Sequence, residues 1–421
     1  MSIRYPHLES LKIFDRDWFS TTSPLWSSIA DFINENPTST TIQLTANKTT
    51  ELPIEIWDTI KENKNVKALR LDRIKIDVSQ ARSFWKACTV LEKLDMNHCT
   101  ISDPWEDVTG SRPLPPLFPL IQEINFTKLE GINEYGQLQI AAMSPRLRSL
   151  CWNGTGFPIT RFAFDNTLGI SLLNLDELDL KGKAHSTDIA FFIATNKKPL
   201  KKLAVPLFTR DSFINVFEYA SRPRLPDLSC LERHFSTLQD LDFADSTPTS
   251  IELLKILSLC PLLTSFKANV ILASDVKRNE AWACADRLLK LDVCIDLGQC
   301  NPEVASRRVF ACLSKLTSLE DLNLGRNETT DAFLRTAVEP LRLQLDHGMD
   351  QLSTLWRMKR FYFSDQGQTM TMKEGRWIKK HWRGLEVIQG TFNPDEVLNA
   401  QINNLFRREN KRFLRRQKMI E

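Results

Sequence analysis

The sequence predicts an α/β solenoid, with a parallel β-sheet on its concave face and helices on its convex face. Two observations predict this fold. A phrase of the form LxxLxLxxN, seen most fully at Leu319–Asn327, recurs along the chain. Segments with helical apolar spacing alternate with it. One strand-and-helix unit cannot bury its apolar face alone, so the units are expected to stack.

The strand phrases share three apolar residues, at positions one, four and six. Most begin about 25 to 31 residues apart, close to the period of leucine-rich repeats. Residues 1–392 are therefore predicted to form a leucine-rich-repeat solenoid of about 14 units. Their first residues are Leu8, Val66, Leu91, Ile121, Leu147, Leu175, Leu200, Leu238, Leu263, Leu288, Leu319, Met358 and Leu385, with a weak further copy at Ile42/Leu44.

The apolar residues at positions four and six alternate on a strand, so they point to the same side and enter the core. Leu178 and Leu180 are one such pair. Position nine favours Asn or Cys, whose small polar side chain bonds backbone groups of the turn. Asn327 and Cys99 occupy this position.

Helical phrases lie between the strands, and several end at a proline just before the next strand, as at Pro145, Pro199 and Pro261. The predicted helices are Trp26–Asn36, Glu55–Asn63, Gln80–Cys88, Asp188–Thr195, Ile251–Leu259, Val304–Leu316 and Lys373–Trp382.

Three segments interrupt the repeat, near residues 103–119, 206–236 and 328–357. The first carries five proline residues and is predicted to be a loop. The second is either an extension of the binding surface or a tolerated insertion. The first strand, Leu8–Ile13, starts the array without a cap, so we expect a segment before Met1 or a partner on this edge.

Residues 393–421 are predicted to form a helical cap with a basic tail. From Asp395 onward, seven bases and four acids give +3, which equals the net charge of the whole chain. The basic run Arg407–Lys418 has two interpretations: a solvated helix end, or a nucleic-acid contact or nuclear address. We favour the first, so a nucleic-acid partner is not expected, and the basic tail leaves that alternative open.

Several classes of protein are disfavoured. No apolar stretch of about 18 residues exists to cross a membrane, and the first residues lack the apolar core of a signal peptide. Nine scattered cysteines without a CxxC pair indicate reduced thiols in the cytoplasm or nucleus. No HExxH, GxSxG, phosphate-loop or GxGxxG motif appears, so we predict neither an enzyme nor a cofactor.

The candidate site is the concave face, where the residues between the core positions point. Asp or Asn recurs there, and a row of carboxylates suits a basic peptide. The alternative is that a sheet face exposed to water is polar in any case. The candidate partner-binding residues are Asp95, Asn125, Asn153, Asp179, Asp242, Asp292, Asn323 and Tyr362.

The phrases at 91–99, 175–180 and 319–327 resemble ribonuclease-inhibitor-like leucine-rich repeats, and more narrowly the fungal leucine-rich-repeat proteins of F-box type. The closing segment Trp382–Gly390, followed by Phe392, is similar to that family's last repeat. In such proteins an F-box joins an adaptor and a cullin in an SCF ubiquitin ligase, and the repeats select the substrate.

Leu52–Ile60 is similar to the opening of an F-box, but Val66–Leu71 begins the next strand after only five residues. No recognisable F-box is therefore present, and we predict a repeat helix here. The predicted function is a non-catalytic scaffold that binds a protein partner on the concave face. The alternative is a substrate-recognition subunit of a cullin-type ligase whose F-box is lost, divergent or missing.

Overall fold

A computed structural model describes most of the chain. The described residues are 8–15, 24–102, 117–153, 174–180, 193, 196, 198–205, 230–244, 248–276, 281–325, 338–364 and 367–407. The chain divides into two compact units, Met1–Leu200 and Lys201–Glu421, which are described separately below.

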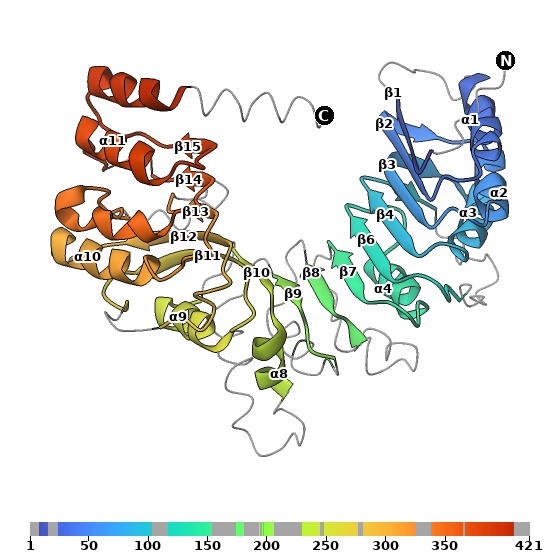
Figure 1. The fold of residues 1–421 in the computed structure, drawn as a ribbon. Coiled ribbons are helices and arrows are strands. Elements are labelled where there is room, and N and C mark those ends of the chain that lie inside the picture. Colours follow the sequence, from blue (N-terminus) through green and yellow to red (C-terminus); the bar gives the residue numbers. More distant parts are fainter. Residues whose placement is uncertain are drawn as a thin grey trace. The chain divides into compact units, whose positions relative to one another are not determined.

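The first unit is built on a parallel sheet with the strand order β1-β2-β3-β4-β6-β7-β8, and β5 pairs with β3 beside β4 (Figure 1). The strands are β1 Ser10–Asp15, β2 Thr41–Glu51, β3 Ala68–Ile76, β4 Lys93–Asn97, β5 Thr100–Ile101, β6 Glu123–Thr127, β7 Ser149–Trp152 and β8 Glu177–Leu180. The helices are α1 Pro24–Glu35, α2 Ile54–Glu62, α3 Val78–Cys88 and α4 Glu134–Ala142.

The second unit repeats this plan with the strand order β9 to β15, again parallel throughout. The strands are β9 Lys202–Ala204, β10 Asp240–Phe243, β11 Ser265–Leu272, β12 Lys290–Asp296, β13 Asp321–Asn323, β14 Arg360–Tyr362 and β15 Val387–Gln389. The helices are α8 Cys230–Thr237, α9 Ser250–Leu259, α10 Pro302–Leu313 and α11 Met372–His381, with the 3-10 helices η4 Leu345–His347 and η5 Met349–Thr354.

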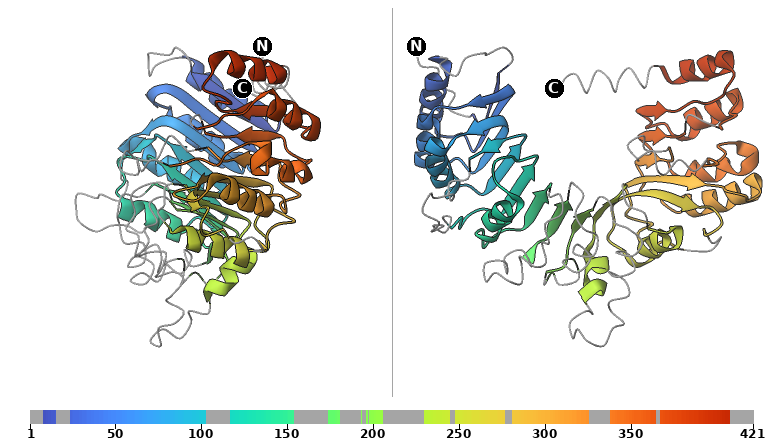
Figure 2. Two further views of the ribbon diagram at one scale, coloured as in Figure 1. Left: turned by 90° about the vertical axis from the view of Figure 1, so that its left-hand side faces the viewer. Right: turned by 180° about the vertical axis from the view of Figure 1, so that it is seen from behind.

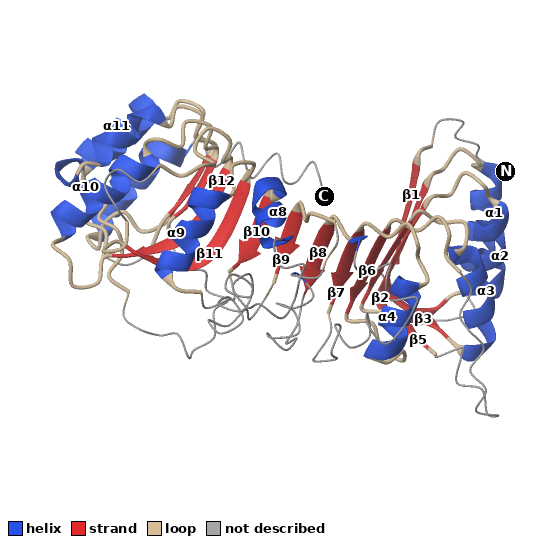
Figure 3. Ribbon diagram, turned by 90° about the horizontal axis from the view of Figure 1, so that it is seen from below, coloured by secondary structure: helices blue, strands red, loops and turns tan. Residues whose placement is uncertain are grey.

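In each unit the helices lie on one side of the sheet and leave the other face uncovered (Figures 2 and 3). The core lies between the sheet and the helices. On β4, for example, Leu94 and Met96 are fully buried, whereas Lys93, Asp95 and Asn97 are partly exposed. Parallel strands whose core positions pair in register, with helices on one face, confirm the predicted α/β leucine-rich-repeat fold.

One backbone conformation recurs in three repeats of the first unit. Arg73, His98 and Lys128 stand two residues beyond core position six of their repeats, and all three have a left-handed φ of 51–58°. Cys99 comes next at position nine, where its thiol donates to the carbonyl oxygens of Leu71 and Asn97. This is the backbone-bonding role that the sequence predicts for a Cys at position nine.

Burial sets the chemistry of the cysteines. The structure describes Cys88, Cys99, Cys260 and Cys284 as free and buried, and burial raises the pKa of all four thiols. For Cys99, Cys260 and Cys284 the pKa reaches about 12. These thiols are therefore protonated and unreactive near neutral pH.

The C-terminal part of the second unit is held by aromatic contacts. Residues 396–407 are helical, and Ile402 and Phe406 are buried. The Phe406 ring stacks on Phe392 at 5.9 Å, and Phe392 meets Phe363 at 5.1 Å. Gly375 on α11 allows close approach, because an added Cβ there would lie only 3.1 Å from the Leu405 side chain.

The elements differ from the predicted ones in several places. The weak copy at Ile42/Leu44 is a full strand, β2, and both residues are fully buried. Helix α4 was not predicted. The predicted insertions at 206–236 and 328–357 contain α8, η4 and η5, and otherwise lie partly outside the described residues.

Some predictions fall where the structure gives no description. These are most of the loop 103–119, helix Asp188–Thr195 apart from Ile193, position nine at Asn327, and the basic tail beyond Arg407. The helical phrase Leu52–Ile60 is described, and it forms α2, which packs between α1 and α3.

Candidate binding face

The uncovered face of each sheet, called here the open face, carries a continuous row of side chains in register. In the first unit the row takes one residue from each main strand: Lys12, Gln43, Arg70, Asp95, Asn125, Cys151 and Asp179. The row exists because every repeat places the same position, between core residues four and six, on this face.

Neighbouring members of this row bond to one another. The Asn125 side-chain amide donates to Asp95 Oδ1 at 2.8 Å. The Arg70 guanidinium lies 4.0 Å from Asp95 Oδ2 on the other side. The Thr127 hydroxyl then donates to Asn125 Oδ1 at 2.7 Å. The Asp95 carboxylate is thus held between a base and an amide.

A second row runs two residues further along the same strands, through Phe14, Thr45, Asp72, Asn97 and Thr127. The Asn97 amide donates to Asp72 Oδ1 at 3.2 Å. Phe14 is 58% exposed, which places a large apolar ring at the β1 end of this otherwise polar surface.

The second unit has an equivalent row of its own: Ala204, Asp242, Lys267, Asp292, Asn323, Tyr362 and Gln389. The Lys267 ammonium lies 3.6 Å from Asp242 Oδ2, and both side chains are about 40% exposed. An exposed pair of this kind adds at most about 1 kcal/mol to stability, so the pair is available to an external partner.

Tyr362 lies beside the Arg360–Asp321 ion pair, whose atoms Nη2 and Oδ2 are 2.8 Å apart. Burial raises the pKa of the Tyr362 phenol, and the Asp321 carboxylate acts in the same direction. The phenol therefore keeps its proton near neutral pH. It presents a hydrogen-bond donor with an apolar ring, the combination that is enriched at binding interfaces.

The predicted site residues fall on the open face with one exception. Asp95, Asn125 and Asp179 lie in the row of the first unit, and Asp242, Asp292, Asn323 and Tyr362 lie in that of the second. Asn153 instead follows the end of β7, where its backbone N–H donates to Phe126 O. Whether these residues bind a partner stays a prediction.

Sequence reasoning did not select Lys12, Gln43, Phe14 and Thr127, which also lie on the open face. For Lys12 and Gln43 the signal was present, because each stands between two core residues of its strand. Phe14 and Thr127 follow core position six, and that position was considered in only some repeats.

Among the described residues, no group of three His, Cys, Asp or Glu side chains could hold a metal ion. In the part of the chain that the structure describes, no helix is both long and apolar enough to span a membrane.

No protein-family model matches the sequence, and no curated protein matches it significantly. Among solved structures, an internalin of Listeria monocytogenes is similar, with 13% identity over 87% of each chain and a TM-score of 0.38. The plant peptide hormone receptor RGFR1 in complex with RGF2 has 13% identity over 85% of this chain and 63% of its own, with a TM-score of 0.30.

TLR13 in complex with ssRNA13 has 15% identity over 84% of this chain and a TM-score of 0.42, and this chain spans less than half of its length (46%). With TM-scores below 0.5, none of these likenesses bears on function, and the fold assignment rests on this chain's own repeats.

Proposed function

We propose that the protein is a non-catalytic scaffold that binds a protein partner on the open face of its sheets. One observation carries this proposal. In both units a row of polar side chains crosses successive strands in register, on the face that the helices leave uncovered. Regular, rigid rows of this kind offer many recognition points at low entropic cost, because the strands already hold the side chains in place.

The contacts refine the chemistry expected of the partner. Asp95 lies beside Arg70 and Asn125, and Asp242 lies beside Lys267. The face therefore alternates bases, acids and amides instead of presenting only carboxylates. This pattern suits a partner surface with both charges in a matching order more than a uniformly basic peptide.

The test compares two charge reversals. Asp95→Lys alters the open face, and Asp58→Lys makes the same change at an exposed position of α2 on the helix side. Tagged wild-type and variant chains are used for affinity purification from extracts of the source organism. We expect proteins that co-purify with the wild type and Asp58→Lys to be lost with Asp95→Lys.

Equal recovery with both variants would support the alternative that the face is polar only because it is exposed to water. Recovery that is lost on nuclease treatment would instead favour a nucleic-acid partner for the basic tail. Circular dichroism of both variants checks that neither change unfolds the chain.

The alternative function, substrate recognition in a cullin-type ubiquitin ligase, is carried by the phrase Leu52–Ile60. Its residues Ile56, Trp57 and Ile60 are fully buried, and they belong to α2, the helix that connects β2 to β3 along the chain. That placement favours a repeat helix, and so the scaffold, over an adaptor-binding F-box. Co-purification of a cullin and its adaptor with the wild-type chain would reverse this preference.

We also propose a cytoplasmic or nuclear location. The support is the scattered positions of the cysteines and the burial of several as free thiols, as for Cys88 and Cys99. Microscopy of a fluorescent fusion that concentrates in the secretory pathway would contradict it.

A further inference from the structure

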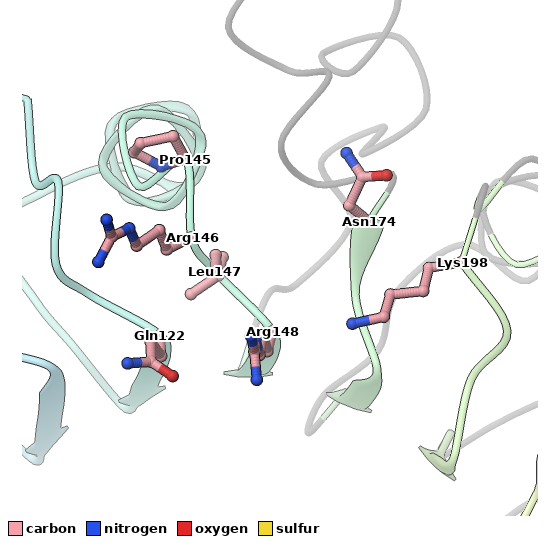
Figure 4. A pocket seen from close by; sticks show the side chains of 7 residues that line it. All are labelled: Gln122, Pro145, Arg146, Leu147, Arg148, Asn174 and Lys198. Atoms are coloured by element: carbon pink, nitrogen blue, oxygen red, sulfur yellow. The ribbon is translucent and has the colours of Figure 1, made fainter.

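A hollow of about 420 Å³ lies at the amino-terminal ends of the strands in the first unit (Figure 4). It is lined by residues from successive turns: Gln122 before β6, Arg146 and Arg148 before β7, Asn174 before β8, and Lys198. Pro145 and Leu147 complete the lining. This hollow is at the strand ends, so it is separate from the rows of the open face.

The backbone holds these turns in a regular ladder. Arg148 N–H donates to Gln122 O, and Asp176 N–H donates to Arg148 O, each at 2.8 Å. The residue just before each strand therefore sits at an equivalent place in every repeat. Because the ladder belongs to the fold, the backbone positions of Gln122 and Arg148 are set before any ligand binds.

Two charge pairs lie along these turns. Lys67 pairs with Glu92 at 3.0 Å, and Lys198 pairs with Asp176 at 2.7 Å. In Figure 4 the Lys198 side chain extends back toward the strand that follows Asn174. Lys198 thus already has a carboxylate, and the pair contributes no net charge.

Arg146 and Arg148 differ from these pairs. Both are exposed, and among the described residues neither guanidinium has a carboxylate within ion-pair distance. Among the described residues, the lining holds three bases and no acid, so together with Asp176 these groups carry a net charge of +2. Guanidinium and ammonium groups are donors only, and amides such as that of Gln122 add further donors.

A donor-rich hollow with a surplus of two positive charges selects an anion with several acceptor oxygens. Arginine matches phosphoryl oxygens in a bidentate arrangement. A volume of about 420 Å³ exceeds the space of a phosphoryl group alone and falls within the range of sites for larger ligands. The space remaining accommodates the side chain that carries the phosphoryl group.

We propose that this hollow binds a phosphorylated side chain of a peptide, with Arg148 holding the phosphoryl group and Arg146 adding positive charge at the rim. The Lys198–Asp176 pair lies beside it, so an ammonium donor is also at hand. The site is independent of partner binding on the open face, and it adds recognition of a modified partner to that function.

The test measures binding of small probes to the full chain by isothermal titration calorimetry. The probes are N-acetyl phosphotyrosine amide and N-acetyl phosphoserine amide, their unphosphorylated forms, N-acetyl glutamate amide and inorganic phosphate. We expect at least one phosphorylated amide to bind more tightly than inorganic phosphate, and the unphosphorylated forms not to bind.

The double variant Arg146→Ala/Arg148→Ala should weaken this binding at least about tenfold, because it removes the charge-assisted contact of Arg148 and the positive charge of Arg146. The matched control Arg82→Ala/Lys86→Ala removes two exposed bases from α3 and should leave the affinity unchanged. Because all four residues are exposed, both variants are expected to fold, which circular dichroism verifies.

The proposal is overturned if neither phosphorylated amide binds, or if both double variants weaken binding equally, which would indicate charge alone. Binding of inorganic phosphate or of the glutamate probe as tightly as the phosphorylated amides would also overturn it. None of these outcomes bears on the open face, since Asp95→Lys is tested separately.

Discussion

Leu69 and Arg70 are adjacent on β3 but face opposite sides of the sheet, so they test the architecture within one strand. Leu69 is fully buried, and its register partners Ile42 and Leu94 are fully buried as well. Arg70 is 46% exposed, and its nearest ion-pair partner is 4.0 Å away.

Leu69→Ala removes three buried carbon atoms, worth about 2.4 kcal/mol at about 0.8 kcal/mol each. The cavity that remains adds to this loss, so the free energy of unfolding should fall by about 3–4 kcal/mol. Arg70→Ala removes only an exposed, long ion pair and should cost less than about 0.5 kcal/mol.

The assay is urea denaturation, followed by circular dichroism and tryptophan fluorescence. Trp57, which is buried on α2 with its ring 5.1 Å from Phe84, is one of ten tryptophans and contributes a signal from the first unit. A cost below about 0.5 kcal/mol for Leu69→Ala, or an equal cost for the two variants, would refute the assigned register.

Further predictions concern the core of both units. Leu178→Ala and Leu322→Ala each change a fully buried residue and should each cost about 2–5 kcal/mol, separating the single unfolding curve into two transitions measured by the same assay. Gln137→Met leaves two carbonyls and an indole N–H without their hydrogen bonds, so it should lower the free energy of unfolding by at least about 2 kcal/mol. The control Gln139→Met changes a partly exposed residue of the same helix and should leave the thermal melting temperature nearly unchanged. The pKa of Cys99 is about 12 when folded and 9.0 ordinarily, so its contribution to stability is complete below pH 9 and is lost as the pH rises toward 12. Above pH 9 the free energy of unfolding should therefore fall more steeply with pH for the wild type than for Cys99→Ala, by about 1.4 kcal/mol per pH unit. Urea denaturation at several pH values measures both slopes.

The strands could be predicted because each carries its own local signal. Leu94 and Met96 alternate with polar residues and follow Leu91 at the repeat spacing, and the structure buries all three. The strand β2 was underestimated, because its second half, from Thr45 to Glu51, is largely polar and lacks this alternation.

Helix α4 was missed for a related reason. In this helix, Glu134–Ala142, the buried residues include Gly136 and Gln137 as well as Leu138 and Ile140. The polar and apolar residues therefore do not separate into two faces. Gln137 is buried because its amide bonds Leu129 O, Ile132 O and the Trp152 indole. Such tertiary bonds leave no periodic trace in the sequence.

The candidate site, too, could be predicted only in part from the sequence. Alternation within a strand predicts that Asp95 and Asn125 face one side, and they do. That they bond each other, and that Arg70 approaches Asp95, depends on register between strands about 25–30 residues apart. The hollow beside Arg148 has no sequence signal at all, because its lining comes from separate turns.

The central claim is that the open face, and not the helix side, contacts the protein partner. Hydroxyl-radical footprinting of the chain with a partner from the affinity experiment tests it directly. Tyr362 and the exposed Phe14 report on the open faces, and the exposed Val78 and Ile251 report on the helices α3 and α9. We predict that the partner reduces labelling at Phe14, Tyr362 or both and leaves Val78 and Ile251 unchanged. Protection confined to Val78 or Ile251 would contradict the claim.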